Sequence, residues 1–330
     1  MNVIVASHAP AALARDRQER MSSARHVPVM VDEVLQYLLH AHSCLVVDGT
    51  VGFGGHAEAI LNARADVSLI GIDRDPAAIV AAAARLAPFA ARVRLVPGAY
   101  SDFTAIFSGA ERADGMLLDL GVSSVQIDER ERGFSHSHSG PLDMRMGSTG
   151  ETAAQMIARA DLDTLTGWMR EFGEVRQPRR VARAILRARD EGVLATTGDL
   201  RAAVEQAIGR GAAPAELSRV FQALRIVVND ELGHLRRFLD GVLDRLNPGG
   251  RLVIISYHSL EDRMVKQFMR DASASCVCPP EVPLCVCGRS PLIRMLTRRA
   301  LGPRDQEIAR NPRSRSAHLR AAEKVGPDAA

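Results

Sequence analysis

The residues best suited to chemistry gather in one glycine-rich stretch, Val-Val-Asp-Gly-Thr-Val-Gly-Phe-Gly-Gly-His-Ala at positions 46–57. Glycines at 52, 54 and 55 let the backbone adopt positive φ and let a ligand approach it closely. The pattern predicts a buried strand, a loop and a helix that begins near His56, whose unpaired N–H groups face the ligand. Such a loop is typical of a nucleotide pocket, and a purely structural glycine turn is the alternative.

Two classes of nucleotide cofactor fit this loop. The residues Gly52-x-Gly54-x-x-Ala57 match the loose dinucleotide fingerprint, and Asp73 follows where a ribose-binding acid is expected. The run Asp48-x-x-x-Gly52-x-Gly54 also resembles the first motif of S-adenosylmethionine (SAM) methyltransferases. A carboxylate at Asp48 repels a pyrophosphate, whereas it stabilises the sulfonium and the ammonium of SAM. Asp48 therefore favours SAM over a dinucleotide.

The other candidate residues follow predicted strands. Apolar runs predict strands at 44–47, 68–72, 92–96, 115–118 and 252–256. Helical patterns alternate with these runs, which indicates a parallel sheet whose ligands lie outside the carboxyl ends of the strands. Four residues fall at or beyond such ends: Asp48, Asp73, Phe103 and Asp119. We therefore expect one crevice, with Phe103 as an apolar wall for an adenine ring or, alternatively, as a core residue.

A long insertion separates the last two predicted strands. About 130 residues lie between positions 118 and 252, whereas a parallel crossover needs only a dozen or more, so roughly 90 residues are inserted. Four segments of the insertion have helical periodicity: 153–160, 162–172, 178–189 and 199–208. The predicted fold class is α/β, a mostly parallel sheet with an inserted all-helical subdomain. The predicted boundaries are 25–133 and 224–322 for the sheet domain, 134–223 for the insertion, 1–24 for an extension expected to be disordered, and 323–330 for a tail.

Composition and charge restrict the class of protein. A chain of 330 residues with 46% hydrophobic content can bury a sizeable core. No apolar run is long enough for a membrane span, so we predict a cytoplasmic protein without membrane association. The net charge of +3 is too small to indicate nucleic-acid binding by itself. Arg180, Arg183 and Arg187 share one helical face, which is either an RNA-binding face or ordinary solvated surface.

Two further groups of residues have more than one interpretation. Cys276-x-Cys278-x6-Cys285-x-Cys287 pairs thiols that can bind zinc, but the usual zinc knuckle spacing is C-x2–4-C. We therefore expect no metal site and favour a mobile loop, with no zinc that folding requires. His258, after the fifth predicted strand, is either a base or RNA contact or a residue that caps the strand end. The capping role is favoured.

Several motifs together resemble those of the bacterial 16S ribosomal RNA cytosine-N4 methyltransferases (the RsmH/MraW type). The matching blocks are His26 to Met30, Asp48 to His56, Gly71 to Asp75, Asp114 to Ser124, Glu131 to Ser135, Pro141 to Met146, Ser256 to Asp262 and Asn311 to Ala317. They cover most of residues 25–322. Two features depart from the family pattern. Val125 stands where the family often has proline, and the extension before Arg25 has no counterpart.

The resemblance implies a SAM-dependent methyltransferase (Rossmann-like) fold with SAM as the methyl donor. It implies N4-methylation of cytosine 1402 in the 16S rRNA, with the small ribosomal subunit as the partner. By motif, the residues that contact SAM are Gly54, Gly55, His56, Asp73, Phe103, Asp119 and Gln126. A homodimer is compatible with the sequence, which does not fix the oligomeric state.

Asp119 is the predicted catalytic residue. The exocyclic amine of cytosine is a poor nucleophile because its lone pair is delocalised into the ring, so an acceptor must take its hydrogens. Asp119 or a backbone carbonyl of its loop is the candidate, and the base must be unstacked to reach it. Two other functions stay open: an NAD-binding oxidoreductase, which the fingerprint alone permits, and a non-catalytic RNA-binding assembly factor, which the basic surfaces permit.

Overall fold

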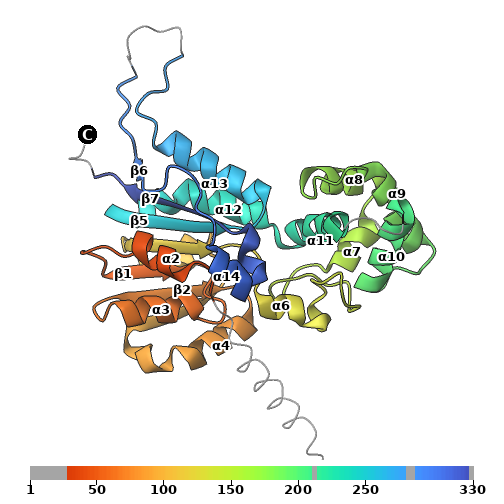
Figure 1. The fold of residues 1–330 in the computed structure, drawn as a ribbon, viewed down its shortest axis with the longest axis horizontal. Helices are drawn as coiled ribbons and strands as arrows, with labels where there is room; N and C mark the ends of the chain where they lie inside the picture. Colours follow the sequence, from red (N-terminus) through yellow and green to blue (C-terminus); the bar gives the residue numbers. More distant parts are fainter. Residues whose placement is uncertain (1–27, 210–213, 280–286, 327–330) are drawn as a thin grey trace, which may run out of the picture.

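A computed structural model describes residues 28–209, 214–279 and 287–326 of the chain (Figure 1). It contains a seven-stranded sheet with helices packed on it, and a lobe of further helices to one side (Figure 1). The predicted fold class, a mostly parallel α/β sheet with a helical insertion, is therefore confirmed. The extension expected to be disordered at residues 1–24 lies outside the described residues, as does the end of the tail.

The strands place three carboxylates at one edge of the sheet. In chain order the strands are β1 Leu45–Asp48, β2 Ser68–Asp73, β3 Val93–Pro97, β4 Ala113–Asp119, β5 Leu246–Ser256, β6 Ile293–Met295 and β7 His318–Lys324. Their spatial order is β3-β2-β1-β4-β5-β7-β6. The first five are parallel, and β7 is antiparallel to both β5 and β6. Asp48, Asp73 and Asp119 are thus the last residues of strands that end at the same edge.

Helices of the sheet domain cover both faces of the sheet. They are α2 Val31–Leu38, α3 Gly55–Ala63, α4 Pro76–Arg85, α5 Phe103–Ile106, α6 Ser124–Asp128, α12 Glu231–Gly241, α13 Ser259–Ala272 and α14 Asp305–Arg310. One core joins α2, α3 and α4 to the sheet through residues such as Val46, and the other joins α12 and α13 through residues such as Val47. Neighbouring residues of β1 enter opposite cores because successive side chains of a strand point to opposite faces.

The insertion has a core of its own. Its helices are α7 Ala153–Arg159, α8 Leu162–Glu171, α9 Pro178–Asp190, α10 Thr197–Ile208 and α11 Pro214–Asn229. The buried residues of this core run from Leu142 to Leu224, and Val228 packs against it. Helix α11 therefore continues through the boundary placed at 223/224, and the domain limits stay predictions. Across the described parts of the chain, no helix is long and apolar enough to cross a membrane.

Polar contacts join the insertion to the sheet domain where α11 meets α12. The two helices are separated by Asp230, whose φ of 47° lies in the left-handed region. The buried Asn229 side chain accepts from Met146 N at 2.7 Å and donates to Met144 O at 2.8 Å. Arg74, after β2, donates to Asn229 O at 2.8 Å. The end of β2 is thereby tied to the exit from the helical lobe.

The sequence analysis did not predict β6 and β7. Strand β7 lies between β5 and β6 in the sheet, and its buried residues include Arg320. The Arg320 guanidinium donates to both carboxylate oxygens of Asp262 on α13, at 2.7 and 3.1 Å. A C-terminal segment rich in arginine therefore contains an interior strand, because the charge of Arg320 is paired inside the fold.

Candidate active site

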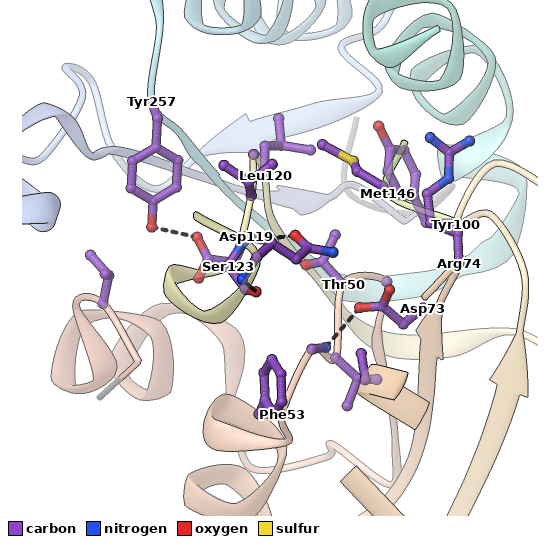
Figure 2. Close-up of a pocket in the computed structure, with 18 of the residues that line it drawn as sticks. Thr50, Phe53, Asp73, Arg74, Tyr100, Asp119, Leu120, Ser123, Met146 and Tyr257 are labelled. Carbon is purple, nitrogen blue, oxygen red and sulfur yellow. Dashed lines mark hydrogen bonds between the residues drawn. The ribbon is translucent and has the colours of Figure 1, made fainter. Parts of the chain in front are cut away.

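A cavity of about 340 Å³ opens at the carboxyl edge of the parallel strands. Its walls come from the loop after β1, the ends of β2 and β4, the loop after β3, and residues of α11, α12 and α13 (Figure 2). The volume falls within the range of small-molecule pockets. Of the four residues expected to meet in one crevice, Asp73 and Asp119 line this cavity.

The glycine-rich loop supplies the floor of this site. Gly52 has a φ of 51°, and its N–H donates to Asp73 Oδ2 at 2.9 Å. Gly55 and His56 line the cavity. Gly54 is not among the lining residues, and a Cβ added to it lies 3.4 Å from the Leu86 side chain beside α4. Gly54, with a φ of 79°, therefore shapes the turn, and a direct contact with a cofactor stays a prediction.

Asp73 lies on one wall, as predicted (Figure 2). Its carboxylate accepts from the backbone N–H groups of Gly52 and Asp75, both at 2.9 Å. Burial raises the pKa of Asp73, and these two hydrogen bonds oppose the rise. Each carboxylate oxygen has a further lone pair that can accept from a ribose hydroxyl.

Asp119 lies on the opposite wall, held in place by three neighbours. Tyr257 donates its hydroxyl to Asp119 Oδ1 at 2.7 Å, and Asp119 N donates to Thr50 Oγ1 at 2.7 Å (Figure 2). His56 Nε2 lies 3.4 Å from Asp119 Oδ2. Burial, together with the Asp119 charge, raises the pKa of Tyr257, which therefore stays a donor. The carboxylate is thus fixed with one oxygen against the phenol and the other beside His56.

Gln126 lines the cavity, but both ends of its amide already have partners. Its Oε1 accepts from Ser123 N at 3.0 Å in a capping box, and its Nε2 donates to Asp75 Oδ2 at 3.0 Å. Arg132 pairs with the same Asp75 oxygen at 2.8 Å. The capping box forms although Val125 stands where proline is frequent in the family. Gln126 therefore positions the loop after β4, and its contact with SAM stays a prediction.

Phe103 requires a correction. It does not line the cavity and instead stacks with Phe107 and Phe238, at centroid distances of 6.3 and 5.6 Å. Its ring fills space beside Gly241, where an added Cβ lies 2.7 Å from Phe103 Cε2. Tyr100, three residues earlier, is the aromatic residue that reaches the cavity wall (Figure 2). In this structure Phe103 packs in the core, and its contact with SAM stays a prediction.

Asp48 is buried below the loop and does not line the cavity. Its Oδ1 accepts from Thr50 N at 3.1 Å, while its Oδ2 has no hydrogen-bond partner within the described chain. Burial raises the pKa of Asp48 to about 7, against a lowering effect of His56. A positive charge on a bound ligand would favour the ionised form.

A group of charged residues on the far wall was not predicted as part of the site. Arg225 forms two hydrogen bonds with the Glu231 carboxylate, at 2.8 and 3.0 Å, and both residues line the cavity with Glu261. Burial raises the pKa of Glu261, but His258, the Arg225 charge and the Tyr257 N–H together outweigh this effect, so the net pKa is lowered. Periodicity places these residues on helices, but it cannot show which helix face meets a cavity.

His258 has the capping role that the sequence favoured. It is the N-cap of α13, and its Nδ1 accepts from Glu261 N at 3.4 Å. Donor atoms of Glu231, His258 and Glu261 lie within 4.8 Å of one another. The Nε2 of His258 faces Glu261 Oε1 at 3.3 Å. The Arg225–Glu231 pair lies in the same group.

Comparison with known proteins identifies the family of the chain. The sequence pattern of the MraW methylase family matches residues 23–325. The chain belongs to the MraW methylase family. A "Ribosomal RNA small subunit methyltransferase H" of Nitratidesulfovibrio vulgaris (strain DP4) is 49% identical over 92% of this chain and 96% of its own. Proteins of the same name from Anaeromyxobacter sp. (strain K) and Geobacter sulfurreducens are each 48% identical over 91% of this chain, and over 98% and 99% of their own lengths.

Membership of a methylase family and the sheet topology identify the SAM-dependent methyltransferase fold. The dinucleotide-binding fold has the strand order 3-2-1-4-5-6. Here an antiparallel strand, β7, lies between β5 and β6. The oxidoreductase alternative therefore fails on both the family and the topology.

Proposed function

We propose that this protein uses SAM to methylate the N4 amine of cytosine 1402 in the 16S rRNA of the small ribosomal subunit. SAM is the methyl donor, which the methylase family and the fold support. The observation that carries the proposal is the pair of carboxylates, Asp73 and Asp119, on opposite walls of one cavity above a glycine-rich loop. We assign Asp73 to the cofactor and Asp119 to the amine of the base.

The cofactor half of the cavity suits SAM. Asp73 can accept both ribose hydroxyls, Tyr100 can pack against the adenine ring, and Gly52 and Gly55 leave room for close approach of the ligand. Asp48 lies below the loop, where its ionised form can stabilise a sulfonium or an ammonium. The same carboxylate would repel a pyrophosphate.

The transfer step requires a nucleophile and an acceptor. The N4 lone pair attacks the methyl carbon, a C–N bond forms as the S–CH₃ bond breaks, and SAM leaves as neutral S-adenosylhomocysteine. One N4 proton passes to an acceptor, and we assign that role to Asp119, whose carboxylate is oriented by Tyr257. Alignment of the amine with the sulfonium contributes much of the acceleration. The flipped base enters from the side of the helical lobe, where Met146 and Arg225 line the cavity.

The RNA-binding surface that we propose includes α9. Arg180, Arg183 and Arg187 are exposed on one face, while Val181 and Ile185 are buried on the other. A basic face that presents three guanidinium groups is suited to phosphate contacts. We place the enzyme in the cytoplasm with its ribosomal substrate, and a homodimer stays a prediction.

Methyl transfer to isolated subunits tests the proposal. Small subunits from cells that lack the gene are incubated with the protein and labelled SAM, and mass spectrometry locates the product in the 16S rRNA. We expect N4-methylcytosine at position 1402 with wild type and formation that is roughly a hundredfold or more slower with Asp119→Asn. SAM or S-adenosylhomocysteine should also raise the melting temperature, whereas NAD should not. Labelling at another nucleotide, or no stabilisation by SAM, would refute the assignment.

A further inference from the structure

Three cysteines outside the cavity come together on the segment that joins α13 to β6. Cys276 and Cys278 follow the end of α13, and Cys287 precedes β6. Their Sγ atoms all lie within 4.8 Å of one another. Cys285, the fourth cysteine of the motif, lies outside the described residues and carries no part of the argument.

The sulfur positions match a tetrahedral metal site better than a disulfide. The Sγ atoms of Cys276 and Cys287 are 3.9 Å apart, whereas a disulfide bond is about 2.05 Å long. Two thiolates bound to one tetrahedral Zn²⁺ at about 2.3 Å lie about 3.8 Å apart. The observed separation therefore agrees with a shared cation. In addition, Cys278 N donates to Cys276 Sγ at 3.3 Å, a contact that stabilises a thiolate.

The fold fixes both ends of this segment, so the thiols meet because of the tertiary structure. Leu292 N donates to Ala272 O at 2.8 Å, which closes the base of the loop beside α13. Arg289 donates to Asp271 O at the same place. From this base the two arms of the loop extend away from the sheet (Figure 1). A ligand shared by Cys276 and Cys287 would hold the arms together further out.

We propose that Cys276, Cys278 and Cys287 bind one Zn²⁺ ion, which clamps the loop between α13 and β6. Thiolate donors select zinc over magnesium and calcium. Three thiolates leave a fourth coordination position for another donor or water. The proposal departs from the absence of metal expected from the sequence, where only the short C-x-C spacing was visible. Since the loop lies outside the two cores of the sheet domain, the ion serves loop geometry and not methyl transfer.

Metal analysis of the full-length protein tests this site. The protein is produced with added zinc, purified under reducing conditions without chelators and desalted, and the metal is measured by mass spectrometry. We expect about one zinc per chain in wild type and at least tenfold less in a variant that combines Cys276→Ser, Cys278→Ser and Cys287→Ser. Cys44→Ser is the matched control, because Cys44 is an exposed cysteine before β1, and it should keep the wild-type zinc.

Cobalt binding to the wild type gives a second readout, which does not depend on whether the triple variant folds. Wild type from which zinc has been removed, titrated with Co²⁺ alone, should develop thiolate-to-cobalt charge-transfer absorption and the visible bands of a tetrahedral site, and Zn²⁺ should abolish both. Well under one zinc per chain after loading, or a cobalt spectrum without thiolate bands, would overturn the proposal. A disulfide among these cysteines in protein kept under reducing conditions would overturn it as well.

Discussion

Asp119 and Tyr257 form the best-defined polar contact in the cavity. The Tyr257 hydroxyl occupies one oxygen of the carboxylate, which leaves the second oxygen, beside His56, for the amine of a base. A residue that accepts a proton in the transition state should affect the rate more than the affinity for the cofactor. These contacts lead to separate expectations for the two side chains.

For Asp119→Asn we expect single-turnover methylation to fall by roughly 10²–10⁴, the range for a lost acid–base group. For Tyr257→Phe we expect a smaller loss, about ten- to a hundredfold, because a hydrogen bond to a charged group contributes ~1.5–3 kcal/mol. Quench measurements at saturating SAM and RNA, beside direct SAM titrations, distinguish rate from affinity. If Asp119→Asn kept the wild-type methylation rate but bound SAM much more weakly, Asp119 would serve only the cofactor. The proton acceptor would then be a backbone carbonyl of residues 119–124.

The buried Asp48 predicts a pH dependence of stability. Burial raises its pKa to about 7, whereas the unfolded value is about 3.9. Between these values the native chain retains a proton that the unfolded chain has lost, so the free energy of unfolding falls as the pH rises from about 4 to about 7. The full effect is at most ~4 kcal/mol.

Asp48→Asn should reduce this slope and make the protein relatively more stable at neutral pH, while Asp73, whose pKa is also raised, keeps part of it. Urea unfolding across this pH window measures the slope. The control is Asp240→Asn, at an exposed position of α12, which should retain the wild-type slope. If Asp48→Asn kept the same slope, another buried group would be responsible.

Site residues could be predicted where the backbone geometry requires a particular residue type. They could not be predicted where tertiary packing determines which side chain enters the cavity. Asp73 and the glycine loop follow from strand ends and positive φ. Phe103 and Tyr100 are both aromatic residues after β3, and only the neighbouring α12 determines that Phe103 packs inward against Phe238. Tyr257 reaches Asp119 across 138 positions of sequence, a contact that no local pattern reports.

At the scale of single elements, the basic face of α9 is the surface of the helical lobe that we expect to bind RNA. Changing Arg180, Arg183 and Arg187 to Gln should weaken RNA binding and flatten its salt dependence. Each lost phosphate contact lowers the slope of log K against log salt by about 0.7–0.9. Binding is measured at several salt concentrations with ribosomal RNA.

The control for α9 must remove the same number of positive charges elsewhere. Arg112, Arg236 and Arg270 are exposed outside the helical lobe, so changing all three to Gln provides a control of equal charge. We expect the control to keep most of the wild-type slope. If both triple variants changed the slope equally, net charge and not the α9 face would explain RNA binding.

Elements with regular periodicity were predicted closely, and elements that depend on distant partners were not. Helix α4 begins at Pro76 with Asp75 as its cap, as its local sequence indicates. Strand β7 contains Arg320, Glu323 and Lys324 among its seven residues, so its composition suggests surface. It becomes an interior strand only because Asp262 pairs with Arg320 and because β5 and β6 provide its backbone partners.

At the scale of the whole molecule, Asn229 joins the helical lobe to the sheet domain. Asn229→Ala leaves the buried Met146 N–H and Met144 C=O without their side-chain partner. An unsatisfied buried polar group costs about 1–3 kcal/mol, so we expect the free energy of unfolding to fall by that amount. Denaturant unfolding measures it. Asn62→Ala, at an exposed position of α3, should change stability by less than about 0.5 kcal/mol.

The position of β7 has a consequence for the synthesis of the chain. The ribosome makes β5 and β6 before the strand that lies between them, and β7 ends at Lys324, close to the C-terminus. Once β5 has been made, its outer edge therefore has no partner until β7 follows, and open strand edges promote pairing with other chains. A chain cut before His318 would leave the outer edge of β5, and β6 as well, without the strand that joins them.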